Sequence, residues 1–253
     1  MEQLAIIGGT GLTEIPGLEI VRRQVMHTPY GEPSGVLTIG KLYGREIAFL
    51  ARHGYSHSIP PHMINYRANI WALKNHGITH IVAFAVTGGI RADMTPPAIV
   101  IPHQIIDYTY GRQQTFFEKD LREVRHIDFS QPYCPALRAR LVAAAEKAGV
   151  ASINEGVYAA MQGPRLETAA EIDKLERDGC DIVGMTGMPE AALAKELGLS
   201  YATISVVANL AAGRGDEEIT MDAIRANVAE GMKDGAKILQ ALFSRRDNER
   251  KTP

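Results

Sequence analysis

The sequence predicts an α/β fold, with a single domain and a central mixed β-sheet flanked by helices. Two observations support this class. Short apolar runs rich in β-branched residues alternate with longer segments of helical periodicity, as strands alternate with helices in such domains. The chain of 253 residues, 45% apolar and 22% charged, also has enough apolar material for one complete core. We therefore expect one domain at residues 1–243 and a charged tail at residues 244–253.

The predicted strands are short and apolar. They are expected at residues 4–8, 36–40, 45–51, 80–86, 98–102, 156–162, 181–185 and 201–207. The predicted helices, with apolar residues at helical spacing, are expected at residues 64–75, 136–148, 168–178, 189–197 and 222–242. Thr168 and Glu171 have the spacing of a capping box, and Pro135 suits a first helical turn.

Composition argues against several classes of protein. The net charge of −2 gives no basic field for a nucleic acid. No run of 18 apolar residues occurs and the first residues lack a signal sequence, so we expect a soluble, cytoplasmic protein without membrane partners. Cys134 and Cys180 form no CxxC pair, and the histidines have no HExxH spacing, so no metal is expected. A GxSxG hydrolase motif is also missing from the sequence.

Polar and glycine-rich motifs follow several of the predicted strands. They are the GGTG turn at residues 8–11, Arg52 with His53, the GPRLE loop at residues 163–167, Met185 and Asn209. Open α/β sheets bind ligands beyond the carboxyl ends of their strands. We therefore expect these motifs to meet in one site.

One group of these residues is suited to an oxyanion. A glycine turn exposes backbone N–H groups, and Thr10 adds a hydroxyl. Arg52 offers a planar fork of donors that matches phosphate in a bidentate way, and His53 adds a further donor. The Thr186 hydroxyl and the Val86 backbone are further candidates. Taken singly, the glycine turn is also consistent with a plain structural turn, and the Arg-His pair with a solvated surface pair.

Together these motifs resemble the trimeric purine nucleoside phosphorylase and methylthioadenosine phosphorylase family. The resemblance covers nearly the whole chain, through IIGGTGL, HTPYGEPS, LARHG, NYRANIWALK, QGPRLET and GMTGMPEAALAKELGLSYA. It implies a nucleoside phosphorylase domain that assembles as a homotrimer or a dimer of trimers. Residues that the resemblance implies as phosphate ligands are Thr10, Arg52, His53, Val86 and Thr186. It also places Met185 under the ribose, Leu166 against the base, and His126 of VRHIDF in the 5′ pocket of a neighbouring subunit.

The chain departs from adenine-specific members of that family at the base. Those members have serine where this chain has Glu167, and a D-x-D pattern where it has Asn209-Leu210-Ala211. A 6-oxopurine carries an N1–H that a carboxylate accepts, and an asparagine amide donates to O6 and N7. Adenine would leave these polar groups unpaired, which a buried site rejects strongly. The pattern indicates a hypoxanthine-type base.

A second departure concerns the 5′ end of the substrate. Where ordinary nucleoside phosphorylases of the family have a histidine for the 5′-hydroxyl, this chain reads EEITMDAI. Met221, with Ile224, would form an apolar wall suited to a methylthio group. The alternative is a methionine on the core face of the last helix.

The sequence thus leads to the hypothesis of phosphorolysis of S-methyl-5′-thioinosine to hypoxanthine and 5-methylthioribose 1-phosphate. Phosphate is the nucleophile, no metal or organic cofactor is needed, and Asn209, Arg52 and His53 are the expected catalytic residues. The alternatives are a broader 6-oxopurine nucleoside phosphorylase, a methylthioadenosine phosphorylase, a hydrolase of the same fold, or a nucleoside-binding module without activity.

Overall fold

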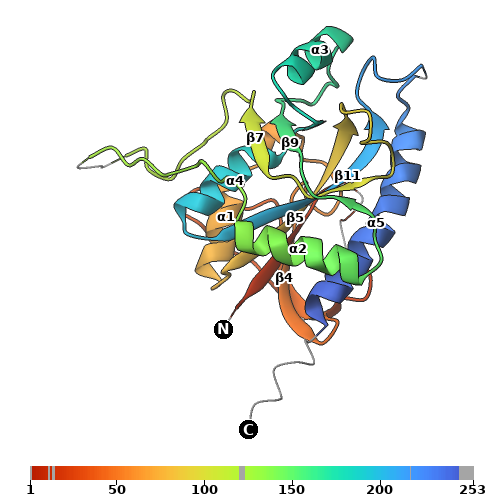
Figure 1. The fold of residues 1–253 in the computed structure, drawn as a ribbon. Helices are drawn as coiled ribbons and strands as arrows, with labels where there is room; N and C mark the ends of the chain where they lie inside the picture. Colours follow the sequence, from red (N-terminus) through yellow and green to blue (C-terminus); the bar gives the residue numbers. More distant parts are fainter. Residues whose placement is uncertain (1, 11, 13–14, 120–122, 217, 245–253) are drawn as a thin grey trace.

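The computed structural model describes residues 2–10, 12, 15–119, 123–216 and 218–244, whose fold is drawn in Figure 1. The elements are β1 (Leu4–Gly8), β2 (Glu19–Gln24), β3 (Leu37–Leu42), β4 (Arg45–Ala51), a 3-10 turn η1 (Pro61–Met63), α1 (Tyr66–Asn75), β5 (His80–Gly89), β6 (Ile99–Val100), β7 (Gln104–Asp107), α2 (Pro135–Lys147), β8 (Ser152–Ile153), β9 (Val157–Ala160), α3 (Ala169–Arg177), β10 (Ile182–Gly184), α4 (Gly187–Glu196), β11 (Ser200–Leu210) and α5 (Met221–Phe243). Of the expected tail, residues 245–253 lie outside the described residues.

The strands form one 11-stranded mixed sheet in which β5 is central. β1 and β11 pair with β5 in parallel, and β4 pairs in parallel with β1. β10 instead pairs antiparallel with the end of β5, and β9 and β7 continue parallel to β10. The two groups of strands therefore run in opposite directions. Their carboxyl ends converge beside residues 84–88 of β5, and this convergence creates the place for a site.

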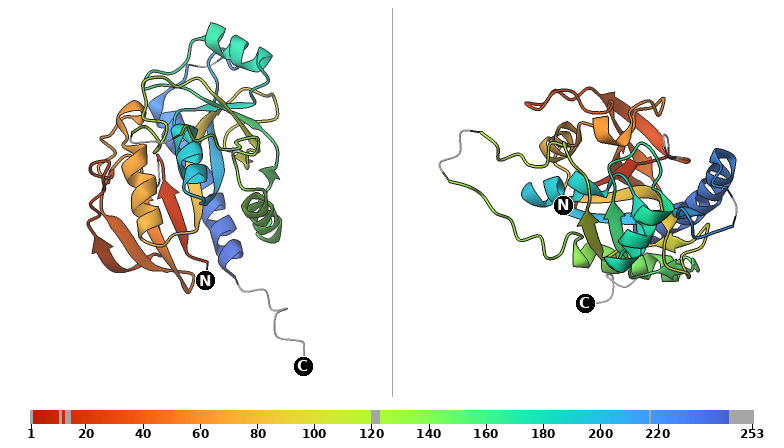
Figure 2. Two further views of the ribbon diagram at one scale, coloured as in Figure 1. Left: turned by 90° about the vertical axis from the view of Figure 1, so that its left-hand side faces the viewer. Right: turned by 90° about the horizontal axis from the view of Figure 1, so that it is seen from above.

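Helices cover both faces of the sheet (Figures 1 and 2). On one face α1 and α4 enclose a core that includes Ile7, Ile70 and Leu193. On the other face α2 and α5 enclose a core that includes Ile6 and Leu141. Ile6 and Ile7 are neighbours in β1 that contribute to opposite cores, because successive side chains of a strand point to opposite faces. Burial on both faces explains why the strand reads as an unbroken apolar run.

The predicted fold class is confirmed, with all five predicted helices present within a few residues of their expected ends. Pro135 begins α2, and Thr168 and Glu171 form the expected capping box at α3. Three strands were not predicted: β2, β7 and β8. β2 is almost wholly exposed and carries no apolar alternation, and β8 is only two residues long. Such strands form because their backbone groups pair with a neighbouring strand. Their side chains therefore show no alternation of apolar and polar residues.

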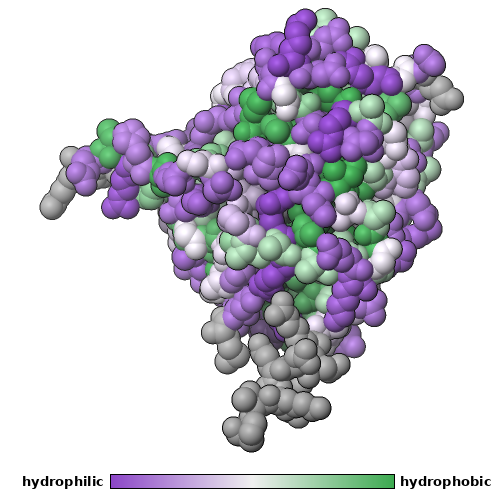
Figure 3. All heavy atoms as spheres, viewed as in Figure 1, coloured by the Kyte–Doolittle hydropathy of each residue, from purple (hydrophilic) through white to green (hydrophobic). Residues whose placement is uncertain are grey.

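The chain between β7 and α2 forms an arm, defined here by its described residues 108–119 and 123–134. It extends away from the body in Figures 1 and 2. Its surface mixes polar and apolar side chains (Figure 3), among them Tyr110 and Val124, which are 70% and 72% exposed. Within the described part of the chain, no helix has the length and apolar character needed to cross a membrane.

Candidate active site

A cavity of about 290 Å³ lies where the two groups of strands converge. Its wall includes most of the residues expected from the sequence, which are Thr10, Arg52, His53, Val86, Leu166, Glu167, Met185, Thr186, Asn209, Ala211 and Met221. They come from seven separate stretches of the chain. The prediction that these motifs meet in one site is confirmed.

The oxyanion end of the cavity combines glycine backbone with hydroxyl groups. Gly9 must be glycine here, because a Cβ would lie 2.7 Å from the Phe84 carbonyl oxygen and 3.0 Å from Nη1 of Arg52. Thr186 precedes α4, and its side chain makes no capping hydrogen bond among the described residues. Its backbone N–H donates to the Tyr158 hydroxyl (3.2 Å). Thr186 itself lines the cavity wall.

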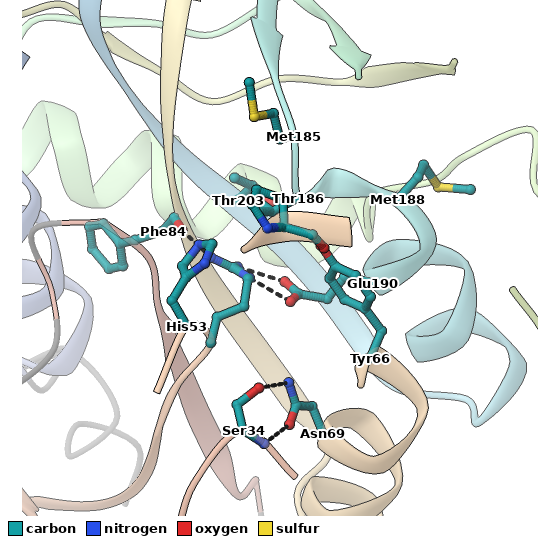
Figure 4. Close-up of polar contacts among 12 residues, drawn as sticks. Ser34, His53, Tyr66, Asn69, Phe84, Met185, Thr186, Met188, Glu190 and Thr203 are labelled. Carbon is teal, nitrogen blue, oxygen red and sulfur yellow. Dashed lines mark hydrogen bonds and ion pairs between the residues drawn. The ribbon is translucent and has the colours of Figure 1, made fainter. Parts of the chain in front are cut away.

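Arg52 is held in a different way from the one expected. Its Nε and Nη2 donate to the two carboxylate oxygens of Glu190 at 2.6 and 2.7 Å, and its Nη1 donates to the Phe84 carbonyl (2.9 Å). Figure 4 shows the two contacts to Glu190 as dashed lines beside His53 and Phe84. Glu190 therefore occupies the Nε–Nη2 edge of the guanidinium, so a phosphate could not bind at that edge. Only the outward N–H groups of Nη1 and Nη2 remain for an anion.

Glu190 was not predicted, and it organises this end of the cavity. It is fully buried, and it also accepts a hydrogen bond from the Tyr201 hydroxyl (2.8 Å). Burial by itself would lower the pKa of Arg52, but the adjacent Glu190 carboxylate raises that pKa above its ordinary value. The signal in the sequence is a lone glutamate in the apolar run MPEAALA. A charge on the buried side of a helix requires a partner, but the sequence does not say which one.

His53 was expected to donate a hydrogen bond to phosphate, but the structure indicates an acceptor at this position. Its Nδ1 lies 2.8 Å from the Ile59 carbonyl oxygen, which can only accept, so Nδ1 carries the proton. Burial and then the positive charge of Arg52 lower the pKa of His53 to about 4. The ring is therefore neutral near pH 7, and its Nε2 is an acceptor. A phosphate that contacts Nε2 would have to donate a proton to it.

The base end of the cavity is formed by the loop after β9 and by the end of β11. Leu166 is 45% exposed at this wall. Glu167 is half-buried, and this burial raises the pKa of its carboxyl group. Gly163 has φ of +62° and packs so closely on Met185 that a Cβ has no room. The base loop is thus fixed directly against the residue expected under the sugar.

The sequence predicted Asn209 just after a strand, but the residue lies inside β11. The register of β11 against β5 shifts between Val207 and Asn209, and such a bulge changes the direction of the side chain. The Asn209 Nδ2 donates to the Leu210 carbonyl (2.7 Å). This contact fixes the orientation of the amide. One N–H and the Oδ1 atom remain for a base.

Met221 begins α5 and is 56% exposed, whereas Ile224, one turn later, is buried. Both residues line the cavity. The alternative that Met221 belongs to the core face of the helix is therefore wrong. Its thioether and the side chain of Ile224 give this part of the wall an apolar surface.

Two expected substrate contacts are not part of this cavity wall. Leu210 lines a neighbouring hollow with Pro96 and Arg214, which Asn209 and Ala211 also border. His126 is exposed on the arm and lies outside the cavity of its own chain. The wall of the cavity therefore includes eleven of the thirteen expected residues.

The fold and the cavity define an α/β protein with one cavity at the carboxyl ends of its strands, lined by hydroxyl groups, Arg52, Glu167 and Asn209. The chain belongs to the Phosphorylase superfamily, whose family model matches residues 3–244.

Particular relatives are similar over nearly the full chain. A probable S-methyl-5′-thioinosine phosphorylase of Pseudomonas syringae pv. tomato is 56% identical to this chain. The aligned region covers 97% of this chain and 98% of the relative. The 6-oxopurine nucleoside phosphorylase of Pyrococcus furiosus is 42% identical, covering 99% and 96%. Among solved structures, the methylthioadenosine phosphorylase from Schistosoma mansoni in complex with adenine has a TM-score of 0.92 at 32% identity, covering 96% and 91%.

We predict that Glu190→Gln lowers the free energy of unfolding by about 3–5 kcal/mol, because it leaves the buried Arg52 charge without a counter-charge. Urea denaturation measures this loss. Asp234→Asn is the control, since it breaks an ion pair of similar length, 2.7 Å to Lys237, at the surface. That change should cost less than about 1 kcal/mol. Equal losses for both variants would contradict the structural role of Glu190.

We also predict that His53 titrates near pH 4. At every pH above that midpoint the ring is neutral and carries its single proton on Nδ1. Two-dimensional ¹H–¹⁵N NMR of the imidazole rings measures both properties, and His53→Asn identifies the resonance. Because the folded pKa is lowered, the unfolded chain binds more protons between about pH 4 and 6.5, so stability falls as the pH drops through this window. A midpoint at 6.5, or a proton on Nε2, would contradict this structure of the site.

Proposed function

We propose that this protein cleaves S-methyl-5′-thioinosine with inorganic phosphate, releasing hypoxanthine and 5-methylthioribose 1-phosphate. The observation that carries the proposal is one cavity with Glu167 and Asn209 at one end, phosphate-type donors at the other, and the apolar Met221 at its opening. The names of the similar proteins from Pseudomonas syringae and Pyrococcus furiosus agree with a 6-oxopurine substrate.

At the phosphate end, Thr10, Thr186, the backbone at Val86 and the free N–H groups of Arg52 hold the anion. The Nε2 atom of the neutral His53 ring accepts a hydrogen bond from the phosphate hydroxyl. A phosphate oxygen forms a bond to C1′ of the ribose while the bond from C1′ to N9 breaks and its electron pair moves to the purine. The purine anion then takes up a proton from solvent and leaves as hypoxanthine. Holding both reactants in one cavity removes the entropic cost of their encounter during the reaction.

At the base end, the remaining N–H of Asn209 donates to N7 or O6 of the departing purine. This contact strengthens as negative charge develops on the ring, so it lowers the barrier and does not merely tighten binding. Glu167 accepts the N1–H of the 6-oxopurine. Adenine has a lone pair at N1, which would face the Glu167 carboxylate unfavourably.

At the 5′ end, Met221 and Ile224 receive the methylthio group. A hydroxyl in the same position would lose its hydrogen bonds to water without gaining a partner. We propose that His126 completes this opening from the arm of a second copy in a homotrimer, alone or as a dimer of trimers. The exposure of His126 and the length of the arm support this arrangement.

A broader 6-oxopurine nucleoside phosphorylase is the second candidate, favoured by the Pyrococcus furiosus relative. The two are separated by rates of release of the free base from methylthioinosine, methylthioadenosine and inosine, each with and without phosphate. We expect phosphate-dependent release, fastest with methylthioinosine. Equal kcat/KM for inosine would favour the broader enzyme. Release of free sugar without phosphate would identify a hydrolase.

We predict that Glu167→Ser combined with Asn209→Asp shifts the ratio of kcat/KM from methylthioinosine toward methylthioadenosine. The serine removes the carboxylate that opposes adenine N1, and the aspartate accepts from the 6-amino group. Because unpaired buried polar groups discriminate by about 10⁴ or more, a shift of several orders of magnitude is expected. Leu210→Val, at the neighbouring hollow, is the control. An unchanged ratio in the double variant would refute the base assignment.

A further inference from the structure

Arg112 stands at the root of the arm and was not predicted to have any role. It follows β7 through a turn at Gly111, whose φ is +66°. Its side chain enters the body of the protein, where the residue is only 9% exposed. A buried arginine requires partners for most of its five N–H groups, so its contacts identify what it holds.

Every polar contact of Arg112 in the described residues is to a neutral oxygen. Nη1 donates to the carbonyls of Met185 (2.8 Å) and Met188 (2.6 Å) and to the Tyr66 hydroxyl (3.3 Å). Nη2 donates to the carbonyls of Met161 (3.1 Å) and Gln162 (2.8 Å), and Nε to the Gln162 Oε1 atom (3.1 Å). No described carboxylate forms an ion pair with it, so the guanidinium acts as a multiple donor and not as one half of a salt bridge.

These contacts join the segments that form the walls of the cavity. Met161 and Gln162 begin the base loop that ends at Glu167. The Met185 carbonyl belongs to the residue under the sugar position, next to Thr186. Met188 has a non-helical φ and ψ within α4, and Arg112 donates to its carbonyl two residues before Glu190.

We propose that Arg112 is a positioning residue that fixes the base loop against the sugar floor and the start of α4. This inference rests on the proposed function, since it concerns the nucleoside that the cavity holds. One planar guanidinium joins the base loop to Met185, mainly through backbone carbonyl groups. Arg112 touches no substrate. It acts by keeping the Glu167 carboxylate at the correct distance from the base that Asn209 holds.

Gln162 strengthens this arrangement. Its Oε1 accepts from Arg112 and also from the backbone N–H of Tyr110 (3.2 Å). The first residues of the arm and the first residues of the base loop are thus tied by side chain and backbone together. A lysine at position 112 would keep the charge but would present a single nitrogen, which cannot reach the three segments at once.

Arg112→Met and Arg112→Lys test the proposal, with Arg138→Met and Arg138→Lys as matched controls. Arg138 is also an arginine that holds backbone carbonyls, those of Ile101, Pro102 and Asn154, but it lies on α2 and does not line the cavity. For each variant the melting temperature is measured, together with kcat and KM for phosphate, methylthioinosine and methylthioadenosine.

We expect kcat/KM for methylthioinosine to fall about 10²-fold in Arg112→Met, because a displacement of about 1 Å can cost that much. Arg112→Lys should show a smaller loss, and both should lower the ratio of methylthioinosine to methylthioadenosine use. The Arg138 variants should lose melting temperature but keep that ratio. If Arg112→Met does not fold, Arg112→Lys carries the test.

Wild-type kcat and an unchanged substrate ratio in a folded Arg112 variant would overturn this inference alone. The inference would also be overturned if the Arg138 variants changed the substrate ratio as much as the Arg112 variants do. A wild-type protein without phosphate-dependent turnover of any of these nucleosides would overturn the proposed function and this inference with it. The two failures are therefore distinguishable.

Discussion

The buried ion pair between Arg52 and Glu190 is the constraint on which the rest of the site depends. Both side chains are almost completely removed from water, at 1% and 0% exposed, so their desolvation must be offset by close partners. Those partners come from different elements: the Phe84 carbonyl from β5, the Tyr201 hydroxyl from β11, and Glu190 itself from α4. The pair therefore fixes the end of β4 against two strands and a helix, at the point where the anion would bind.

This pairing also sets the electrostatics of the oxyanion end. Because Glu190 balances the charge of Arg52 and His53 is neutral, the wall would hold the phosphate of the proposed reaction mainly through N–H and O–H donors. A bound phosphate would thus keep most of its negative charge. In the reaction that we propose, that charge faces a sugar that becomes positive, and fixed donors around it need no rearrangement as the charge develops. Near-neutrality of the protein wall then favours catalysis over tight binding of phosphate.

The sequence was sufficient for the fold class and for most of the site, because buried strands and helices have clear periodicities and strand ends gather functional residues. β2 escaped prediction since its exposed side chains follow no pattern. The pairing of Arg52 with Glu190 and the tautomer of His53 depend on atoms brought together from distant parts of the chain. Arg112 escaped for the same reason, since its partners are backbone carbonyls, which every residue has.

Both ends of the arm are connected to the cavity of their own chain. Arg112 begins the arm and holds the base loop, while Tyr133 ends it and stacks on Tyr201, with ring centroids 6.1 Å apart. Tyr201 in turn donates to Glu190. A segment anchored in this way is displaced at its ends only by disturbing the base loop or the ion pair. If a second copy grips the arm, as the exposed position of His126 requires in the proposed trimer, assembly and the geometry of both cavities are physically linked.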